Sequence, residues 1–431
     1  MRIIISQNPD DLLQQAEAST KRYREGNSLG PLDGVPIAVK DELNQAGYPT
    51  TVGTRFLGTN PATEDATAVH RLRQAGALLF GKANMHEIGI GVTGLNPHHG
   101  AARNPCDPAR ATGGSSSGSA AAVAAGLCPI AVGADGGGSI RIPAAFCGVP
   151  GLKATFGRVS EHGVAPVCWS VAHAGPIAAS VRDLALAYSA IAGADPADPL
   201  SLGAPTPSLY LPSTDGLKGV RLGVYSPWFE DADEDVVKEC RKLLAQLEDQ
   251  GAQLVEISIP DLPLIRSVHL VTIVSEMATA HDEYYREHRK DYGLDTRLNL
   301  ALGRSLTSRD FVHAQRLRDQ IRDHFDQAFL QVDAIVTPTT GITAPVIPLD
   351  SLPHGESDLE KTMAIMRFVQ AANLTGYPAI SLPAGYDHSG MPVGIQFMGR
   401  AHEEALLLAI GAAAESLVLR RKPAIHSRLL D

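Results

Sequence analysis

The sequence predicts an α/β fold built on a largely parallel β-sheet, because strand-like and helix-like segments alternate along the chain. The first such unit begins with the apolar run Val35–Val39, which is typical of a buried strand. A helix at Asp65–Ala75 follows, with an acidic first turn and Gly76 as its stop signal. The apolar segment Ala77–Phe80 then predicts the next strand.

The same order of elements recurs in the second half of the chain. Val220–Tyr225 is strand-like, and a helix begins at about Glu234. Leu254–Ile259 then alternates with a period of two, as a strand does. The predicted helix carries its apolar residues on one face, namely Val236, Val237, Cys240, Leu243, Leu244 and Leu247.

The remaining segments fit one domain spanning residues 1–431. Residues 262–329 are charged and helical, and we expect them to form a helical excursion over the sheet. Residues 330–431 then complete the sheet. Their predicted elements are strands at Ala334–Pro338, Pro378–Pro383 and Gly394–Met398, and a helix at Glu403–Leu417.

Composition excludes several classes of protein. Among 431 residues, 44% are hydrophobic and 19% charged, which excludes a disordered chain. The net charge is −10, and no basic run is longer than Leu419–Lys422, so we expect no nucleic-acid partner. The five cysteines lack a C-x-x-C pair, which argues against a disulfide framework and a zinc site. The start of the chain has no signal-peptide pattern, so we expect a cytoplasmic protein.

The uncharged stretch Ala111–Ala134 has the length of a membrane span but the wrong content. It opens with glycine and serine and contains Pro129 and Gly133. We therefore expect a loop, a short helix of small residues and a short strand, all buried in protein.

Two glycine-rich clusters are the most unusual features. Gly113–Ser119 leads into an alanine-rich helix, but it lacks the lysine of a phosphate-binding P-loop. Asp135–Arg141 follows a strand, and its three glycines leave backbone N–H groups able to converge on one point. That is the geometry of an oxyanion hole, which stabilises the negative oxygen formed during acyl transfer.

A nucleophilic serine in these clusters needs a base. No serine lies in a G-x-S-x-G elbow, so the 15 histidines offer no obvious Ser-His-Asp triad. Lys40, at the end of an apolar strand, is the alternative, since burial disfavours the charged ammonium form. A purely structural lysine, paired with Asp41 or Glu42, is equally compatible with these residues.

Together these segments resemble the amidase signature family, of the Ser-cisSer-Lys hydrolases. The resemblance rests on the Lys40 strand, both glycine clusters and Pro143–Lys153, and it extends to Gly81–Glu87, Val336–Pro338 and Gly376–Pro378. The chain is most similar to plant-type fatty acid amide hydrolases and related bacterial amidases, through Leu32–Glu42 and Asn84–Gly89 among others. The family fold is a twisted mixed sheet, largely parallel, sandwiched between helices, with a signature core expected at about 30–190.

The resemblance implies a catalytic triad of Ser139 as nucleophile, Ser115 as bridging serine after a cis peptide bond at Gly114, and Lys40 as base. It also implies an oxyanion hole formed by the backbone N–H groups of Gly136, Gly137, Gly138 and Ser139. No metal or other cofactor is implied. We expect Asp135 and Arg141 to pair and shape the loop, with Ser116 orienting or capping it.

The sequence gives weaker evidence for the substrate than for the catalytic residues. We expect Met85, Ile88, Gly89, Ile90 and Val92 to line an acyl pocket, together with Gly114, Trp169 and Ile342. The expected reaction is hydrolysis of a linear carboxamide, such as an N-acylamine or fatty acid amide, to an acid and an amine or ammonia. Esters and carbamates are further candidate substrates.

Two other functions stay open at this stage. One is the glutamine-hydrolysing A subunit of a tRNA-dependent amidotransferase, and the other is a catalytically inactive binding protein on the same fold. Only 39 residues precede Lys40, fewer than in most members of the family, so membrane association is not expected. A homodimer remains open.

Overall fold

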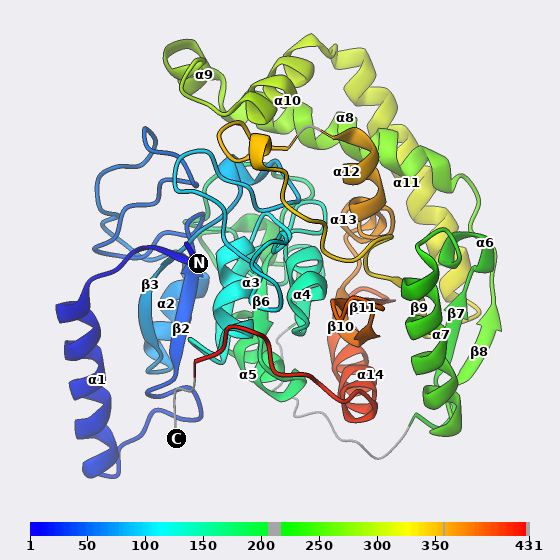
Figure 1. Cartoon of the computed structure of the whole chain (residues 1–431), viewed down its shortest axis with the longest axis horizontal. Helices are drawn as coiled ribbons and strands as arrows, with labels where there is room; N and C mark the ends of the chain where they lie inside the picture. Colours follow the sequence, from blue (N-terminus) through cyan, green and yellow to red (C-terminus); the bar gives the residue numbers. More distant parts are fainter. Residues whose placement is uncertain (206–216, 357, 428–431) are drawn as a thin grey trace.

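The computed structural model describes residues 1–205, 217–356 and 358–427. Its centre is an 11-stranded sheet with the order β1-β3-β2-β4-β6-β5-β10-β11-β9-β7-β8 (Figure 1). The strands are β1 (Ile4–Ser6), β2 (Pro36–Lys40), β3 (Leu78–Ala83), β4 (Ile130–Ala134), β5 (Gly151–Lys153), β6 (Ala174–Ala178), β7 (Arg221–Val224), β8 (Gln253–Glu256), β9 (Ala334–Pro338), β10 (Ala379–Tyr386) and β11 (Pro392–Gly399).

Helices connect and cover these strands. The α-helices are α1 (Pro9–Arg24), α2 (Thr67–Gln74), α3 (Ser117–Ala124), α4 (Arg141–Cys147), α5 (Val181–Ile191), α6 (Ser226–Phe229), α7 (Glu234–Asp249), α8 (Leu262–Ala280), α9 (Asp282–His288), α10 (Leu294–Ser305), α11 (Ser308–Phe329), α12 (Leu359–Met366), α13 (Gln370–Thr375) and α14 (Glu404–Leu417). Three short 3-10 helices are η1 (Glu87–Gly89), η2 (Pro199–Ser201) and η3 (Leu349–Ser351).

The sheet is mixed, as predicted. Its parallel pairs lie in two groups, β3-β2-β4 and β9-β7-β8, which contain the two strand–helix–strand units predicted from the sequence. Between them β4, β6, β5, β10, β11 and β9 pair in antiparallel fashion. The sequence alternation therefore identifies the two ends of the sheet better than its middle.

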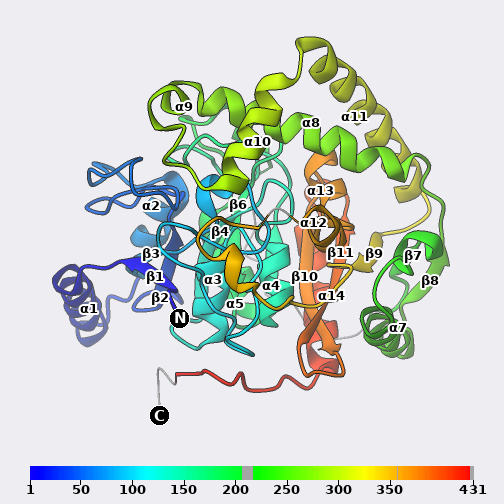
Figure 2. The same ribbon diagram turned by 45° about the horizontal axis from the view of Figure 1, so that its top comes forward.

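Helices pack on both faces of the sheet. One face is covered by α2, α5, α14 and α7, whose apolar sides join the strands in a large common core. The other face is covered by α3 and α4. The predicted helical excursion consists of α8 to α11, which lie across the top of the sheet in both views (Figures 1 and 2).

Helix α3 explains the uncharged stretch around it. All eight of its residues are buried, and Gly118 donates its backbone N–H to the Asn84 carbonyl at 2.8 Å. A Cβ atom at Gly118 would lie 2.4 Å from the Ile3 carbonyl oxygen, so only glycine fits at this position. In the described part of the chain, no helix has the length and apolarity needed to cross a membrane.

Two predicted boundaries were too wide. The helix expected at Asp65–Ala75 begins at Thr67, because the Asp65 carboxylate instead accepts the Ala46 N–H and pairs with Arg73. The strand expected at Leu254–Ile259 ends at Glu256, where the backbone leaves the ladder with β7.

The packing of the sheet gives a first prediction. Phe397 on β11 is fully buried in the core between the sheet and its helices. Phe397→Ala is expected to lower the free energy of unfolding by about 3 to 5 kcal/mol, measured by urea denaturation, because it removes buried contacts and leaves a cavity. The control Leu13→Ala, at a side chain that is 61% exposed, should change it by less than about 0.5 kcal/mol. Equal effects of the two substitutions would contradict this packing.

Candidate active site

Lys40 and Ser115 meet at the end of strand β2. Lys40 ends β2, and Ser115 lies in the glycine-rich loop before α3. The Lys40 Nζ atom lies 2.8 Å from Ser115 Oγ and donates a hydrogen bond to the Ala134 carbonyl at 3.1 Å. The Gly114–Ser115 peptide bond is cis, as the resemblance implies.

Ser139 opens onto the same small cavity. This cavity has a volume of about 30 Å³, and Lys40, Ser115 and Ser139 all line it. The backbone joins the two serine loops, since the Ser116 N–H donates to the Ser139 carbonyl at 3.2 Å. The three residues of the expected triad, far apart in sequence, are therefore neighbours around one cavity.

A buried ion pair shapes the loop that carries Ser139. Arg141 donates from Nε and from one terminal nitrogen to the two oxygens of Asp135, both at 3.0 Å, and both side chains are fully buried. The remaining Arg141 donors are satisfied as well, by Gln396, by the Val369 carbonyl and by Asn373. Burial alone would raise the pKa of Asp135, but the charge and hydrogen bonds of Arg141 hold that pKa far below its usual range.

The same carboxylate folds the glycine cluster. Asp135 accepts the backbone N–H of Gly138 at 2.6 Å and that of Ile140 at 3.1 Å. This corrects one expectation, because the Gly138 N–H is already engaged and is not free to bind an oxyanion. Gly136 and Gly137 line the cavity beside Ser139, so their N–H groups and that of Ser139 are the remaining donors of the predicted hole.

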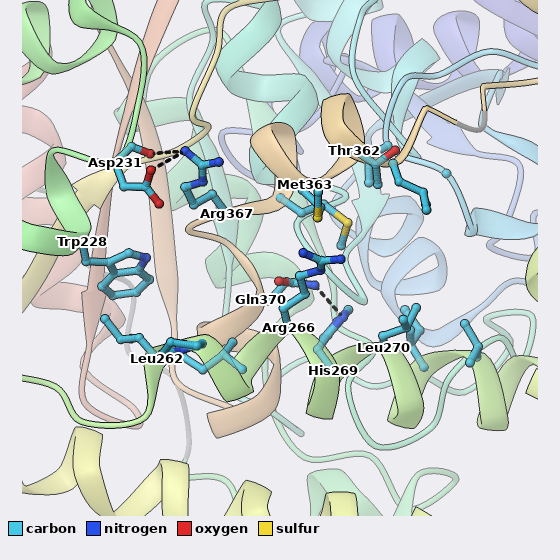
Figure 3. A pocket seen from close by; sticks show the side chains of 18 of the residues that line it. Trp228, Asp231, Leu262, Arg266, His269, Leu270, Thr362, Met363, Arg367 and Gln370 are labelled. Carbon is cyan, nitrogen blue, oxygen red and sulfur yellow. Dashed lines mark hydrogen bonds and ion pairs between the residues drawn. The ribbon is translucent and has the colours of Figure 1, made fainter. Parts of the chain in front are cut away.

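His269 contacts the glycine cluster that precedes Ser139. It projects from α8, and its Nε2 donates to the Gly136 carbonyl at 2.8 Å, while Gln370 lies 3.3 Å from its Nδ1 (Figure 3). Burial lowers the pKa of His269 to about 4, so the ring is neutral at physiological pH. No sequence pattern singles out His269 among the histidines, so the sequence analysis missed it.

Lys40 also has the structural partner that the sequence left open. Glu42 Oε2 lies 2.6 Å from Lys40 Nζ, and both side chains are buried. Asp41 instead turns toward Lys82, at 3.6 Å, and accepts the backbone N–H of Gly53. Lys40 therefore contacts both a serine and a carboxylate, and the two interpretations of this lysine are combined in one site.

Ser116 holds the loop rather than capping the helix. Its hydroxyl donates to the Ala134 carbonyl at 3.1 Å and accepts the Ala134 N–H at 3.3 Å, so it is fixed to β4. No side-chain hydrogen bond caps the start of α3.

A large groove leads to this cavity. Its volume is about 1050 Å³, and helices α8, α10 and α12 form much of its wall. Figure 3 shows side chains of α8 and α12 that line it. Four side chains line both the groove and the small cavity, which makes the two spaces adjacent: Ile90, Val92, Ile273 and Met366. The predicted residues Ile90 and Val92 thus lie at the junction, whereas Ile273 and Met366 come from helices whose apolar residues resemble ordinary core.

Other expected lining residues lie elsewhere. Met85 and Ile88 are fully buried in a hydrophobic cluster beneath the site, and Ile342 packs against a second cluster with Ile142 and Phe146. These three positions were predicted from apolar character alone, which does not separate a pocket wall from core. Gly89 does line the small cavity.

The predicted pocket residues Gly114 and Trp169 do not line the small cavity itself. A side chain at Gly114 would meet the backbone of Gly94 and Gly91, so Gly114 serves close packing of the loop. Trp169 is 48% exposed and lines a separate pocket of about 230 Å³. That pocket shares Val167, Cys168 and Ala172 with the small cavity.

Residues 1–205, 217–356 and 358–427 contain no cluster of histidine, cysteine, aspartate and glutamate able to hold a metal ion.

Comparisons with known proteins identify the family of this chain. The Amidase family model matches residues 4–408. The chain belongs to the amidase family.

Within the amidase family, the similarity extends over the full chain. The fatty acid amide hydrolase of Oryza sativa subsp. indica is 47% identical, over all of this chain and 72% of its own length. The A subunit of the glutamyl-tRNA(Gln) amidotransferase of Chloroflexus aurantiacus is 36% identical, over 97% of this chain and 89% of its own length. The structure of peptide amidase from Stenotrophomonas maltophilia superposes with a TM-score of 0.85 and 32% identity, covering 98% of this chain and 90% of that one. These relatives support hydrolysis of amide C–N bonds.

The acidic residues beside this amidase site predict a pH-dependent stability. Burial is the largest cause that raises the pKa of Glu161 from 4.5 to about 8. Between these two values the folded state keeps a proton that the unfolded state releases, so the free energy of unfolding falls as the pH rises from about 4.5 to about 8. Glu161→Gln should remove this part of the pH dependence in urea titrations, whereas Glu17→Gln, at an exposed position, should not. An unchanged slope in Glu161→Gln would contradict the raised pKa.

Proposed function

We propose that this amidase cleaves linear amides through an acyl-enzyme intermediate on Ser139. The observation that carries the proposal is the 2.8 Å contact between Lys40 and Ser115 at a cavity that Ser139 shares with glycine backbone N–H groups. A serine that is connected to a buried amine through a second hydroxyl can be deprotonated without histidine.

The reaction proceeds in two halves. Ser139 Oγ attacks the amide carbon while its proton passes to Ser115 Oγ, and the Ser115 proton passes to the neutral Lys40 amine. Lys40 then returns a proton through Ser115 to the leaving nitrogen, and the C–N bond breaks to release the amine. Water hydrolyses the acyl-Ser139 ester by the same proton path and releases the carboxylic acid.

The oxygen that becomes negative in each half is stabilised by the N–H groups of Gly136, Gly137 and Ser139. A preorganised donor of this kind contributes about 2.7 to 4 kcal/mol to the transition state. Asp135 and Arg141 keep these donors in position and do not react themselves.

For the substrate, we propose an amide with a long apolar acyl group. The groove that adjoins the cavity is large enough for such a chain, and its junction is lined by Ile90, Val92, Ile273 and Met366. The similarity to plant fatty acid amide hydrolases favours the same substrate class. The role of a glutamine-hydrolysing amidotransferase component is less well supported, since those relatives are more distant and glutamine would leave this groove empty.

The first test of this proposal labels the nucleophile. A fluorophosphonate probe should modify Ser139, identified by peptide mass spectrometry, and the adduct should be absent in Ser139→Ala. Turnover of aryl amides by Ser139→Ala should fall by at least about a thousandfold, because the acyl-enzyme cannot form. Ser117→Ala, at the first residue of α3, serves as the matched control and should keep the Ser139 adduct. Labelling of another serine, or residual activity above a tenth of wild type, would refute the assignment.

The second test addresses the acyl group. Ile273→Trp narrows the junction between groove and cavity, so kcat/KM for a dodecanoyl anilide should decrease at least about tenfold more than for an acetyl anilide. Ile273→Val keeps the passage open and should preserve the preference for the longer chain. Equal losses on both substrates in Ile273→Trp would mean that the acyl chain binds elsewhere.

A further inference from the structure

We propose that Glu42 is a positioning residue of the reaction, which takes up a proton from Lys40 so that the lysine acts as a neutral base. This inference rests on the proposed function. The geometry points to it because Lys40 Nζ lies between Ser115 Oγ, at 2.8 Å, and Glu42 Oε2, at 2.6 Å. A continuous series of contacts thus leads from the Ser115 hydroxyl through the Lys40 amine to a carboxylate.

The burial of Lys40 and Glu42 favours an uncharged pair over an ion pair. The side chains of Lys40 and Glu42 are 1% and 6% exposed. Two opposite charges withdrawn from water lose hydration that a single ion pair does not fully replace. Transfer of one proton from the ammonium to the carboxylate removes both charges at once, and the 2.6 Å separation of the two groups is short enough for that transfer.

The hydrogen-bond supply of Glu42 distinguishes it from its neighbours. Asp135, in the same cavity, accepts N–H donors from Gly138, Ile140, Arg141 and Asn373, which stabilise its negative charge. By contrast, Glu42 Oε2 is buried and accepts no hydrogen bond within the ranges that the structure describes; its one close polar contact is the 2.6 Å approach of Lys40 Nζ. A carboxylate oxygen without such donors is poorly suited to hold a lasting negative charge.

The charged groups around the Lys40–Glu42 pair are paired with one another or neutral, so they add little net charge next to it. The Asp135–Arg141 pair, on the β4–α4 connection, is internally neutral, and the Asp41–Lys82 contact balances a second carboxylate on the β2–β3 side. On the segment before β6, burial holds Glu161 protonated up to about pH 8 and raises the pKa of the Cys168 thiol well above 9. His269, on α8, is neutral.

The proton step balances within the pair. One N–H bond of the Lys40 ammonium breaks and one O–H bond forms on Glu42 Oε2, which yields an amine and a carboxylic acid without exchange with solvent. The amine then accepts the Ser115 proton as Ser139 attacks. Because the active form is a tautomer of the singly protonated pair, activity persists to low pH until the pair binds a second proton.

The test is the pH profile of kcat/KM for an aryl amide in wild type and Glu42→Gln. Without the carboxylate, Lys40 must release its proton to solvent, so the acidic limb should move to higher pH by at least one unit. The rate at pH 7 should fall at least tenfold and recover as the pH increases. Wild type should retain most of its activity at about pH 6, a result that does not depend on any variant folding.

Controls separate this role from a structural one. Glu161→Gln removes a nearby carboxyl that is already uncharged below about pH 8, so its acidic limb should stay within half a unit of wild type. Glu42→Asp restores a carboxylate and should return the limb toward the wild-type position. Equal unfolding midpoints and equal fluorophosphonate labelling of Ser139 establish that the variants are folded.

Three outcomes would overturn the inference. A limb that moves to lower pH in Glu42→Gln would mean that Glu42 stays ionised and only stabilises the ammonium. If Glu42→Gln lowers kcat/KM equally at every pH without moving the acidic limb, or changes nothing, Glu42 has only a packing role. Loss of wild-type activity below about pH 8 would also exclude the neutral pair. Failure of the proposed function itself is distinct, since wild-type turnover would then persist in Ser139→Ala.

Discussion

The buried pair of Asp135 and Arg141 is the interaction on which the rest of the site depends. It joins the end of β4 to the first residue of α4, and through Val369, Asn373 and Gln396 it ties this loop to α13 and β11. These partners lie more than two hundred residues further along the chain. The glycine backbone next to Ser139 is therefore shaped by contacts from both ends of the sequence, and its flexibility is removed where the chemistry requires fixed donors.

Part of this arrangement could be predicted from the chain, because the two glycine clusters and the strand that ends at Lys40 together resemble one family, although the lysine alone left a structural role equally open. The strand–helix–strand units at β2-α2-β3 and β7-α7-β8 follow from hydrophobic periodicity. The antiparallel middle of the sheet does not, since β5 has three residues and pairs with strands distant in sequence. Long-range pairing of this kind leaves no local pattern.

The site residues that could not be predicted from the sequence were also missed because their roles depend on long-range contacts. Lys40, Ser115 and Ser139 were found through their motifs, whereas Glu42 and His269 have importance only through the atoms they face. Met85 and Ile88 were misjudged because apolar residues look alike in a core and in a pocket. The Gly138 N–H was assigned to the oxyanion hole although its bond to Asp135 depends on loop geometry that composition does not report.

Helix α8 serves two purposes, since Leu262, Ile273 and other residues line the groove while His269 holds the Gly136 carbonyl. One helix thus lines the groove proposed for substrate binding and also contacts the loop proposed to stabilise the oxyanion. In the proposed mechanism, an acyl chain bound against α8 would also act on the loop that carries Gly136, so contacts far from the scissile bond would contribute to catalytic rate and not to affinity alone. Selection for a new acyl chain on this helix would then change the turnover number together with the Michaelis constant.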